Sequence, residues 1–290
     1  MASGLAALLA LLDLEPIEVN LFRGNSPDER ESQRVFGGQV LAQALVAAGR
    51  TQQQGVAHSL HAYFLRPGDP RVPILYQVDR TRDGRSFTTR RVTAIQHGRA
   101  IFHLEASFQR AEPGPEHQLE MPAAPAPESL PSFTEHMARS AREAGRPEAW
   151  QGSGAARLPF DHRYATQFNP WLETRLPPRL LVWLRATGAM PDDPLLHQCV
   201  LAYASDLTLM DTALLPHGVP WDGEGYQIAS LDHAMWFHRS FRADEWLLFD
   251  HESPAAAGAR GMISGRLYQR DGRLVASVVQ EGLIRPLRSA

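Results

Sequence analysis

The chain has 290 residues, of which 43% are hydrophobic and 21% are charged, the composition of an ordinary globular protein with one large or two medium domains. Its net charge of -3 lacks the basic excess of nucleic-acid-binding proteins, so we expect no nucleic-acid partner. The sequence contains no lysine, which excludes Schiff-base chemistry and a lysine nucleophile.

The cysteine content and the two ends of the chain limit the cellular context. Cys199 is the only cysteine, so no intramolecular disulfide can form, and its apolar neighbours favour core filler over a nucleophile. Residues 5–14 are apolar but lack the flanking signals of a signal peptide. We predict a short docking helix there and no membrane contact. The ending Arg288-Ser289-Ala290 lacks a peroxisomal Ser-Lys-Leu signal.

The first half of the chain predicts one buried helix followed by four strands. Residues 21–34 are polar and turn-rich, whereas residues 35–49 are apolar, with a glycine pair at the start and Gly49 as a helix stop. The strands are expected at 58–66, 72–81, 86–96 and 100–109. This order describes an antiparallel sheet wrapped around a helix.

The second half begins after a change of composition. Residues 111–157 are rich in Pro, Ala, Glu and Gly, with one helical patch at 133–143, so we predict an interdomain linker. Ordered structure is expected from about residue 163. The expected elements are a strand at 179–187, a helix within 192–210, a loop at 216–225, and strands at 227–239, 245–251, 257–269 and 273–284.

The order of elements in the second half repeats that of the first. The matching segments are Val40–Ala44 with Val200–Ala204, Ser59-Leu60 with Ser230-Leu231, and Gly98-Arg99 with Gly272-Arg273. We therefore predict an α+β fold made of two copies of one helix-in-sheet unit, fused as a pseudo-dimer. The predicted division is a first unit at 1–110, a linker at 111–157 and a second unit at 158–290.

The helix within residues 192–210 contains an unusual carboxylate. Pro194 fits the first turn, and the residues after it are apolar on nearly every face, the pattern of a helix buried all round. Asp206 lies inside this run, where a carboxylate is costly unless it is paired, hydrogen-bonded or used. We interpret it as the group that holds and activates a water molecule. The alternatives are a solvated stripe with Thr208, a cap for the next segment, or an ion pair with an arginine.

The two copies differ at their polar positions. Asp206 aligns with Val46 and Gln280 with Ala106, so only the second copy carries this polar pair. Gln280 lies in a mostly apolar strand, which indicates a bonding partner, although a solvated edge position is the alternative. Ser230 opens another strand, where a hydroxyl is commonplace.

Six stretches of the sequence resemble the acyl-CoA thioesterase II family, the double-hotdog thioesterases of bacteria and peroxisomes. They are residues 34–39, 58–69, 82–87, 203–206, 231–239 and 279–282, in that order. The resemblance implies a double hotdog that hydrolyses acyl-CoA thioesters to free fatty acid and CoA without a metal or another cofactor. Within this family, the missing peroxisomal signal favours the cytoplasmic bacterial branch, and we expect a homo-oligomer, a dimer or tetramer of double hotdogs.

The same resemblance assigns the residues that hold the catalytic water. The family uses an Asp, a Thr or Ser, and a Gln, which fall on Asp206, Ser230 and Gln280; bacterial members carry Thr where this chain has Ser. A positioned water with a carboxylate acceptor suffices for a thioester, whose thiolate leaves readily. We expect Asp206 to act as general base or water-orienting anion, with Ser230 and Gln280 fixing the water's remaining hydrogen bonds.

Four further residues are candidates for substrate binding. Amides at the start of the Gly37-Gly38 helix are suited to polarise the substrate carbonyl, although the glycines equally fit a role in tight packing. Arg85 belongs to a row of arginines suited to CoA phosphates or, equally, to solvent or a subunit contact. His58 is the fourth candidate. Histidines such as His58 and His233 are more typical of core or interface positions than of a serine or metal site.

Other enzyme classes fit the sequence less well. Ser264 lies one position too late in Gly261–Gly265 for a nucleophile elbow, and no spacing typical of metal ligands is present. A hotdog enoyl-CoA hydratase needs an Asp-His pair on its helix, and His197 is too far from Asp206 for that pair. A non-catalytic acyl-CoA sensor remains an alternative, but it would not need Asp206 and Gln280.

Overall fold

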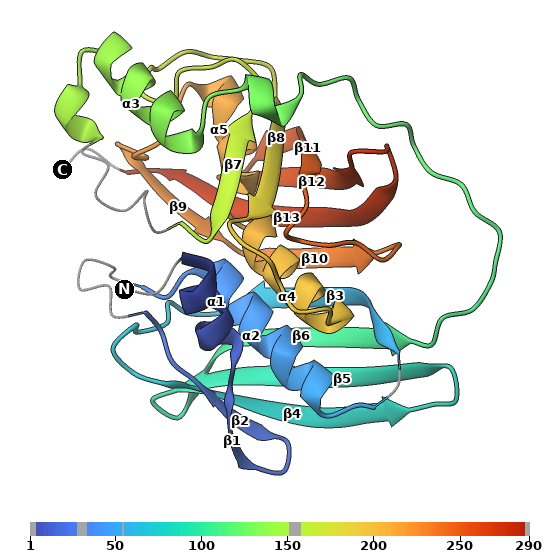
Figure 1. Cartoon of the computed structure of the whole chain (residues 1–290). Coiled ribbons are helices and arrows are strands. Elements are labelled where there is room, and N and C mark those ends of the chain that lie inside the picture. Colours follow the sequence, from blue (N-terminus) through green and yellow to red (C-terminus); the bar gives the residue numbers. More distant parts are fainter. Residues whose placement is uncertain (1–3, 28–33, 54, 151–157, 288–290) are drawn as a thin grey trace.

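Two helix-in-sheet units lie side by side in this protein, as a computed structural model shows (Figure 1). The structure describes residues 4–27, 34–53, 55–150 and 158–287. Within these residues the strands of both units form one continuous antiparallel sheet of 13 strands. None of the helices found there combines the length and the apolar character needed to cross a bilayer.

The first unit wraps a sheet around one buried helix. Its helices are α1 (Gly4–Leu12) and α2 (Gly37–Arg50), and its strands are β1 (Glu15–Glu18), β2 (Leu21–Gly24), β3 (Val56–Phe64), β4 (Ile74–Asp83), β5 (Phe87–Gln96) and β6 (Arg99–Gln109). The strand order is β1-β2-β4-β5-β6-β3. Residues 38–49 of α2 are all buried, because this helix packs against the sheet on one side and against α4 of the second unit on the other.

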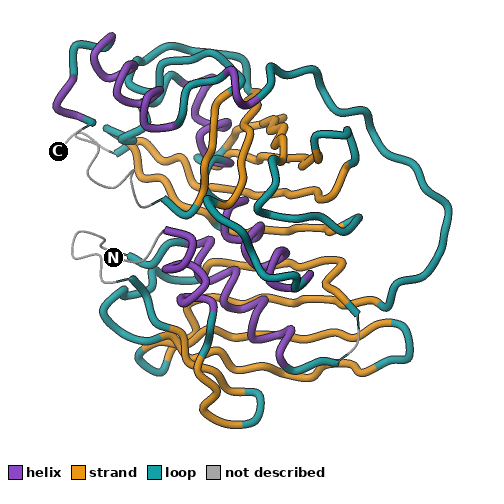
Figure 2. Tube along the Cα trace, viewed as in Figure 1, coloured by secondary structure: helices purple, strands orange, loops and turns teal. Residues whose placement is uncertain are grey.

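The second unit repeats this plan and joins the first edge to edge. Its elements are β7 (Phe160–Tyr164), β8 (Arg179–Ala186), α4 (Pro194–Ser205), α5 (Leu209–Leu214), β9 (Tyr226–Ser230), β10 (Asp232–Phe237), β11 (Leu247–Ala257), β12 (Arg260–Gln269) and β13 (Leu274–Pro286). The strand order is β10-β13-β12-β11-β8-β7, with β9 paired to β13. β3 and β10 pair at the junction, and α2 and α4 lie next to each other on one side of it (Figure 2).

A long connection links the two units. It leaves β6 and runs around the outside of the molecule to the helix α3 (Phe133–Glu143), as Figure 1 shows. A capping box starts α3, because Ser132 and Glu135 exchange side-chain and backbone hydrogen bonds. Residues 151–157, the end of the predicted linker, and residues 288–290 lie outside the described residues. The division at 110/111 and 157/158 therefore stays a prediction.

Matching hydrogen bonds define how the two units correspond. The amides of Leu65 and Arg66 donate to the carbonyl of Ile101, and those of His238 and Arg239 donate to the carbonyl of Val275. The offset is therefore 173 residues between β3 and β10 (238 − 65) and 174 between β6 and β13 (275 − 101).

These offsets test the predicted alignment of the two copies. Gln280 corresponds to Ala106, as predicted, because their strands share the offset of 174. Ser230 corresponds to Ala57 rather than to Ser59, so the predicted match of the two Ser-Leu pairs is wrong by two residues. Serine and leucine are commonplace in strands, and their recurrence did not fix the register.

Three predicted elements differ from the structure. The hairpin β1–β2 occupies residues 15–24, partly within a stretch predicted as turns. The predicted strand 227–239 is divided at Leu231, whose amide donates to the carbonyl of Glu281. The predicted helix within 192–210 ends at Ser205 and a new helix starts at Leu209, so Asp206 is a helix C-cap and not an interior residue.

Candidate active site between the two units

A cavity of about 570 Å³ lies where the start of α2 faces the end of α4. Its lining combines apolar side chains, which include Phe36, Phe64 and Met210, with polar ones, which include Asp206 and Ser230. This volume lies within the usual range of small-molecule sites. The cavity is therefore the place where groups from both units can act on one ligand.

Asp206 has three hydrogen-bond partners around its carboxylate. The hydroxyl of Ser230 donates to Oδ1 at 3.3 Å, and the amide of Gly38 and the side chain of Gln280 also bond this group. Burial raises the pKa of Asp206 to about 6, and the three hydrogen bonds oppose that rise. The group is therefore ionised at neutral pH yet binds a proton more tightly than an ordinary Asp, as a general base requires.

Gln280 and Ser230 meet beside this carboxylate. Gln280 lies on β13 and is fully buried, and its Nε2 donates to the hydroxyl of Ser230 at 2.7 Å. Ser230 is the last residue of β9 and pairs with Gly282, which brings its side chain next to that of Gln280. The structure thus brings the three predicted residues into one hydrogen-bonded group.

The glycine pair of α2 leaves space for this group. A Cβ on Gly37 would lie 2.7 Å from Oδ2 of Asp206, and a Cβ on Gly38 would lie 2.5 Å from the backbone oxygen of Tyr203. Both distances are shorter than a real Cβ contact allows. The glycines therefore permit tight packing, which is one of the two roles predicted for them. Gly37 also lines the cavity.

His58 and Arg85, the other two predicted substrate-binding residues, do not line this cavity. His58 lines a second cavity, of about 590 Å³, and its Nε2 lies 2.8 Å from the hydroxyl of Ser107. Arg85 is exposed between β4 and β5. The structure therefore does not bring these two residues together with Asp206.

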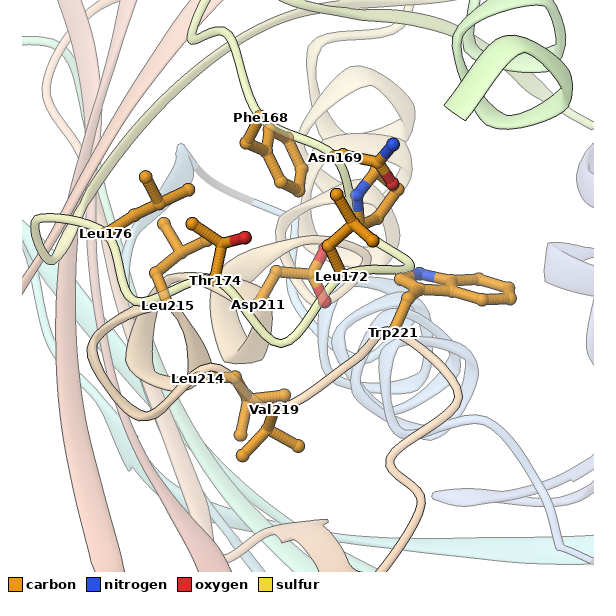
Figure 3. A pocket seen from close by; sticks show the side chains of 11 residues that line it. Phe168, Asn169, Leu172, Thr174, Leu176, Asp211, Leu214, Leu215, Val219 and Trp221 are labelled. Atoms are coloured by element: carbon orange, nitrogen blue, oxygen red, sulfur yellow. The ribbon is translucent and has the colours of Figure 1, made fainter. Parts of the chain in front are cut away.

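Asp211, on α5, is a second carboxyl whose pKa is raised by burial, to about 7. It lines a cavity of about 30 Å³ among apolar side chains that include Leu172 and Leu215 (Figure 3). The hydroxyl of Tyr164 donates to it at 3.4 Å. A space of this size holds one or two water molecules at about 10–15 Å³ each. The geometry therefore favours Asp206 over Asp211 as the group that meets a substrate.

Two polar residues behind Gln280 were not among the predicted site residues. Nδ1 of His233 lies 2.8 Å from Oε1 of Gln280, and Nε2 lies 3.0 Å from the hydroxyl of Ser205. Burial lowers the pKa of His233 to about 4, so its ring is neutral at neutral pH. The sequence holds a signal for this residue, because His233 shares the inward face of β10 with Met235 and Phe237.

Two family models of acyl-CoA thioesterases match this chain. The model described as "Acyl-CoA thioesterase N-terminal domain" matches residues 26–109, and the model described as "Acyl-CoA thioesterase" matches residues 159–283.

In the described part of the chain, no three His, Cys, Asp or Glu side chains are grouped as metal ligands.

Relatives and solved structures agree with these models. Human acyl-coenzyme A thioesterase 8 is 44% identical over 285 residues, which cover 95% of this chain and 88% of the relative. The crystal structure of the acyl-CoA thioesterase II TesB2 from Mycobacterium marinum has a TM-score of 0.79 at 45% identity, covering 97% of this chain and 98% of that one. A protein with a hotdog fold from Alicyclobacillus acidocaldarius, 18% identical, has a TM-score of 0.78 and covers 97% of this chain and 99% of its own. The chain therefore belongs to the acyl-CoA thioesterase II family and has the double-hotdog fold that the sequence predicted.

Proposed function

We propose that this protein hydrolyses acyl-CoA thioesters to free fatty acid and CoA, with a water molecule held by Asp206, Ser230 and Gln280. The observation that carries the proposal is the hydrogen-bonded group of these three side chains beside a cavity that also has apolar side chains in its lining. The family assignment supports the same reaction, because the relatives are named as acyl-CoA thioesterases.

In this mechanism Asp206 accepts a proton from the water as the water oxygen attacks the thioester carbonyl carbon. A C–O bond forms and the carbonyl oxygen becomes negatively charged; its electrons then return and the C–S bond breaks. The thiolate of CoA takes up the proton that Asp206 accepted. The products are a carboxylic acid and a free thiol, so no covalent intermediate with the protein is required.

Gln280 and Ser230 orient the water in this scheme. The Gln280 amide donates one N–H to Ser230 and also bonds the Asp206 carboxylate. We propose that the water takes the place of this second bond, accepting from the Gln280 N–H and donating to Asp206. A water held by this donor and by the Asp206 carboxylate keeps a lone pair for the carbonyl carbon. The apolar side chains Phe36, Phe64 and Met210 are suited to the acyl chain.

The test compares two carboxyl groups whose pKa values are both raised by burial. Purified protein is incubated with acyl-CoAs of different chain lengths, and the released thiol is measured. Asp206→Asn should lower kcat by about 100-fold to 10,000-fold, the range for loss of a general base. Asp211→Asn, the matched control on α5, should keep kcat within about threefold, because Asp211 lines a different cavity.

Two results would contradict the proposal. Unchanged thiol release in Asp206→Asn would remove this carboxylate from the mechanism. Binding of acyl-CoA without any thiol release would favour the non-catalytic sensor.

The predicted homo-oligomer and cytoplasmic location are separate proposals. Light scattering of the purified chain measures its oligomeric state.

A further inference from the structure

We infer that His233, together with Ser205, is a positioning residue that fixes the side-chain amide of Gln280 with its nitrogen toward Ser230. The inference rests on the proposed function, because it concerns which end of the amide faces the reacting water. His233 does not line the cavity itself and acts only through Gln280.

The direction of each hydrogen bond follows from the Asp206 carboxylate. An ionised carboxylate can only accept, so the hydroxyl of Ser230 must donate to it. The single proton of Ser230 is then used, and its oxygen accepts from Nε2 of Gln280. The other end of the amide, Oε1, consequently faces His233 and needs a donor there. The amide orientation is thus a consequence of where the protons lie.

The imidazole of His233 supplies that donor only in one tautomer. Its Nδ1 lies 2.8 Å from Oε1 of Gln280, so the proton must be on Nδ1. A neutral ring then has an unprotonated Nε2, an acceptor that lies 3.0 Å from the hydroxyl of Ser205. The hydroxyl of Ser205 also lies 2.9 Å from the carbonyl of Ala202. Ser205 therefore favours the Nδ1–H tautomer when its proton is directed to the ring.

The structure shows what an inverted amide would cost. If Oε1 of Gln280 faced Ser230, the single Ser230 proton would have two competing acceptors, Gln280 and Asp206. The carboxylate would lose the bond from Gln280 and compete for that from Ser230, two of the three bonds that lower its pKa, and the water would meet an acceptor where it needs a donor. The two amide orientations are nearly equal in shape, so only a neighbouring group of fixed polarity distinguishes them.

The pairing of β3 with β10 provides the space for this imidazole. His233 lies directly opposite Ala62 on the buried face, where a small side chain leaves room for the ring. The corresponding pair, reached by the offset of 173, is Leu60 opposite Met235, two large apolar side chains. The first unit thus has Leu60 at the position of His233, so the positioning group is confined to the unit that carries Gln280.

Few charged groups surround this chain of hydrogen bonds. Among the described residues, Arg34 and Arg66 are the other charged side chains that line the cavity of Asp206, and the shift in its pKa comes from burial and hydrogen bonds. The neighbouring Asp232 accepts from the amide of Glu281. A change in the pH dependence of the reaction on substitution of His233 therefore reports on the hydrogen bonds of Asp206.

Two amide substitutions separate the two ring nitrogens. His233→Asn places its amide nitrogen near the position of Nδ1 and keeps a donor for Gln280, whereas His233→Gln places it near Nε2, toward Ser205. We expect His233→Gln to lower kcat by about tenfold to 100-fold with little change in KM, as loss of an outer orienting partner does elsewhere. His233→Asn should retain more of the activity than His233→Gln. Thermal unfolding of both variants monitors the fold.

The pH profile and the Gln280→Ala background supply readouts that a purely structural role would not change. In His233→Gln the acid limb of kcat/KM should move upward by about half a unit or more, because Asp206 loses hydrogen bonds to its charged form. In a protein that already carries Gln280→Ala, His233→Gln should have no further effect on kcat.

Three results would overturn the inference. The first is an unchanged kcat in His233→Gln. The second is an equal loss of kcat in His233→Asn and His233→Gln, with the acid limb of kcat/KM unmoved. The third is that His233→Gln lowers kcat as much in the Gln280→Ala protein as in the wild-type protein. Failure of the proposed function gives a different pattern, because Asp206→Asn would then keep wild-type thiol release regardless of the effect of substituting His233.

Discussion

Two cavities of nearly equal size, about 570 and 590 Å³, lie at opposite ends of the helix pair α2–α4. Residues 64–68 line the first, and residues 237–241, their counterparts at the offset of 173, line the second. Duplication of one unit therefore produced two equivalent cavities. Their chemistry nevertheless differs at almost every polar position.

At the second cavity, apolar residues replace the polar group of the first. Ala106 stands at the position of Gln280, Ala57 at that of Ser230, and Val46 aligns with Asp206. At the position aligned with Gly38 is Gln198, whose side chain bonds the amide of Ala57 at 3.1 Å and its carbonyl at 2.7 Å. A side chain thus joins helix and strand at this end, where the first cavity has a glycine. The scaffold is shared, and the polar residues distinguish the two ends.

The largest effect should come from making the second unit resemble the first. Gln280→Ala and Ser230→Ala install the residues found at Ala106 and Ala57. We expect Gln280→Ala to lower kcat by about 100-fold or more and Ser230→Ala by less, because Ser230 bonds the carboxylate while Gln280 bonds both Ser230 and the carboxylate and is the proposed donor to the water. Steady-state thiol release measures both, and wild-type kcat in Gln280→Ala would show that the asymmetry between the units is not catalytic.

A second effect concerns the pH dependence of the reaction, because Asp206, whose pKa is raised by burial, lines the first cavity and not the second. Burial raises the pKa of Asp206 to about 6, so kcat/KM should be constant above that pH and fall about tenfold per unit below it. The folded state binds this proton more tightly than the unfolded chain, so its contribution to stability is present below about pH 4 and is lost as the pH rises through about 6.

Asp206→Asn separates these two consequences of the same pKa. The variant should lose activity. Its free energy of unfolding should also fall less between pH 4 and pH 7 than that of the wild-type protein, which urea unfolding at several pH values measures. Asp211→Asn should leave the acid limb of kcat/KM in place. An acid limb near the ordinary pKa of Asp in the wild-type protein would contradict the assignment.

The smallest effect on activity should come from the second cavity. Gln198→Ala removes two hydrogen bonds to the backbone of Ala57 and should lower the free energy of unfolding by about 1–3 kcal/mol. We expect kcat/KM to stay within about twofold, because Gln198 lines the second cavity and not the one that holds Asp206. Gly38→Ala is the matched change at the other end. Its Cβ would lie 2.5 Å from the backbone oxygen of Tyr203, so it should impair stability and activity together.

The sequence by itself determined the buried helices, most of the strands, the duplication and the unit that holds Asp206 and Gln280. These features follow from local patterns, because apolar periodicity and turn residues act over a few neighbours in the chain. The helix α3 was predicted at its observed bounds, 133–143, for the same reason.

Only the tertiary structure decided the end of α4 at Ser205, the place of Asp206 beside Gly38, and the arrangement of His233 behind Gln280. The catalytic proposal therefore depends on the pairing of β3, β10 and β13, whose register selects which side chains lie opposite each other. A shift of one residue in a strand turns every side chain to the other face, and no local pattern records the register between distant strands. The match of Ser59 with Ser230 was wrong by two residues, a shift that keeps the alternation of faces, so the sequence pattern could not reveal it.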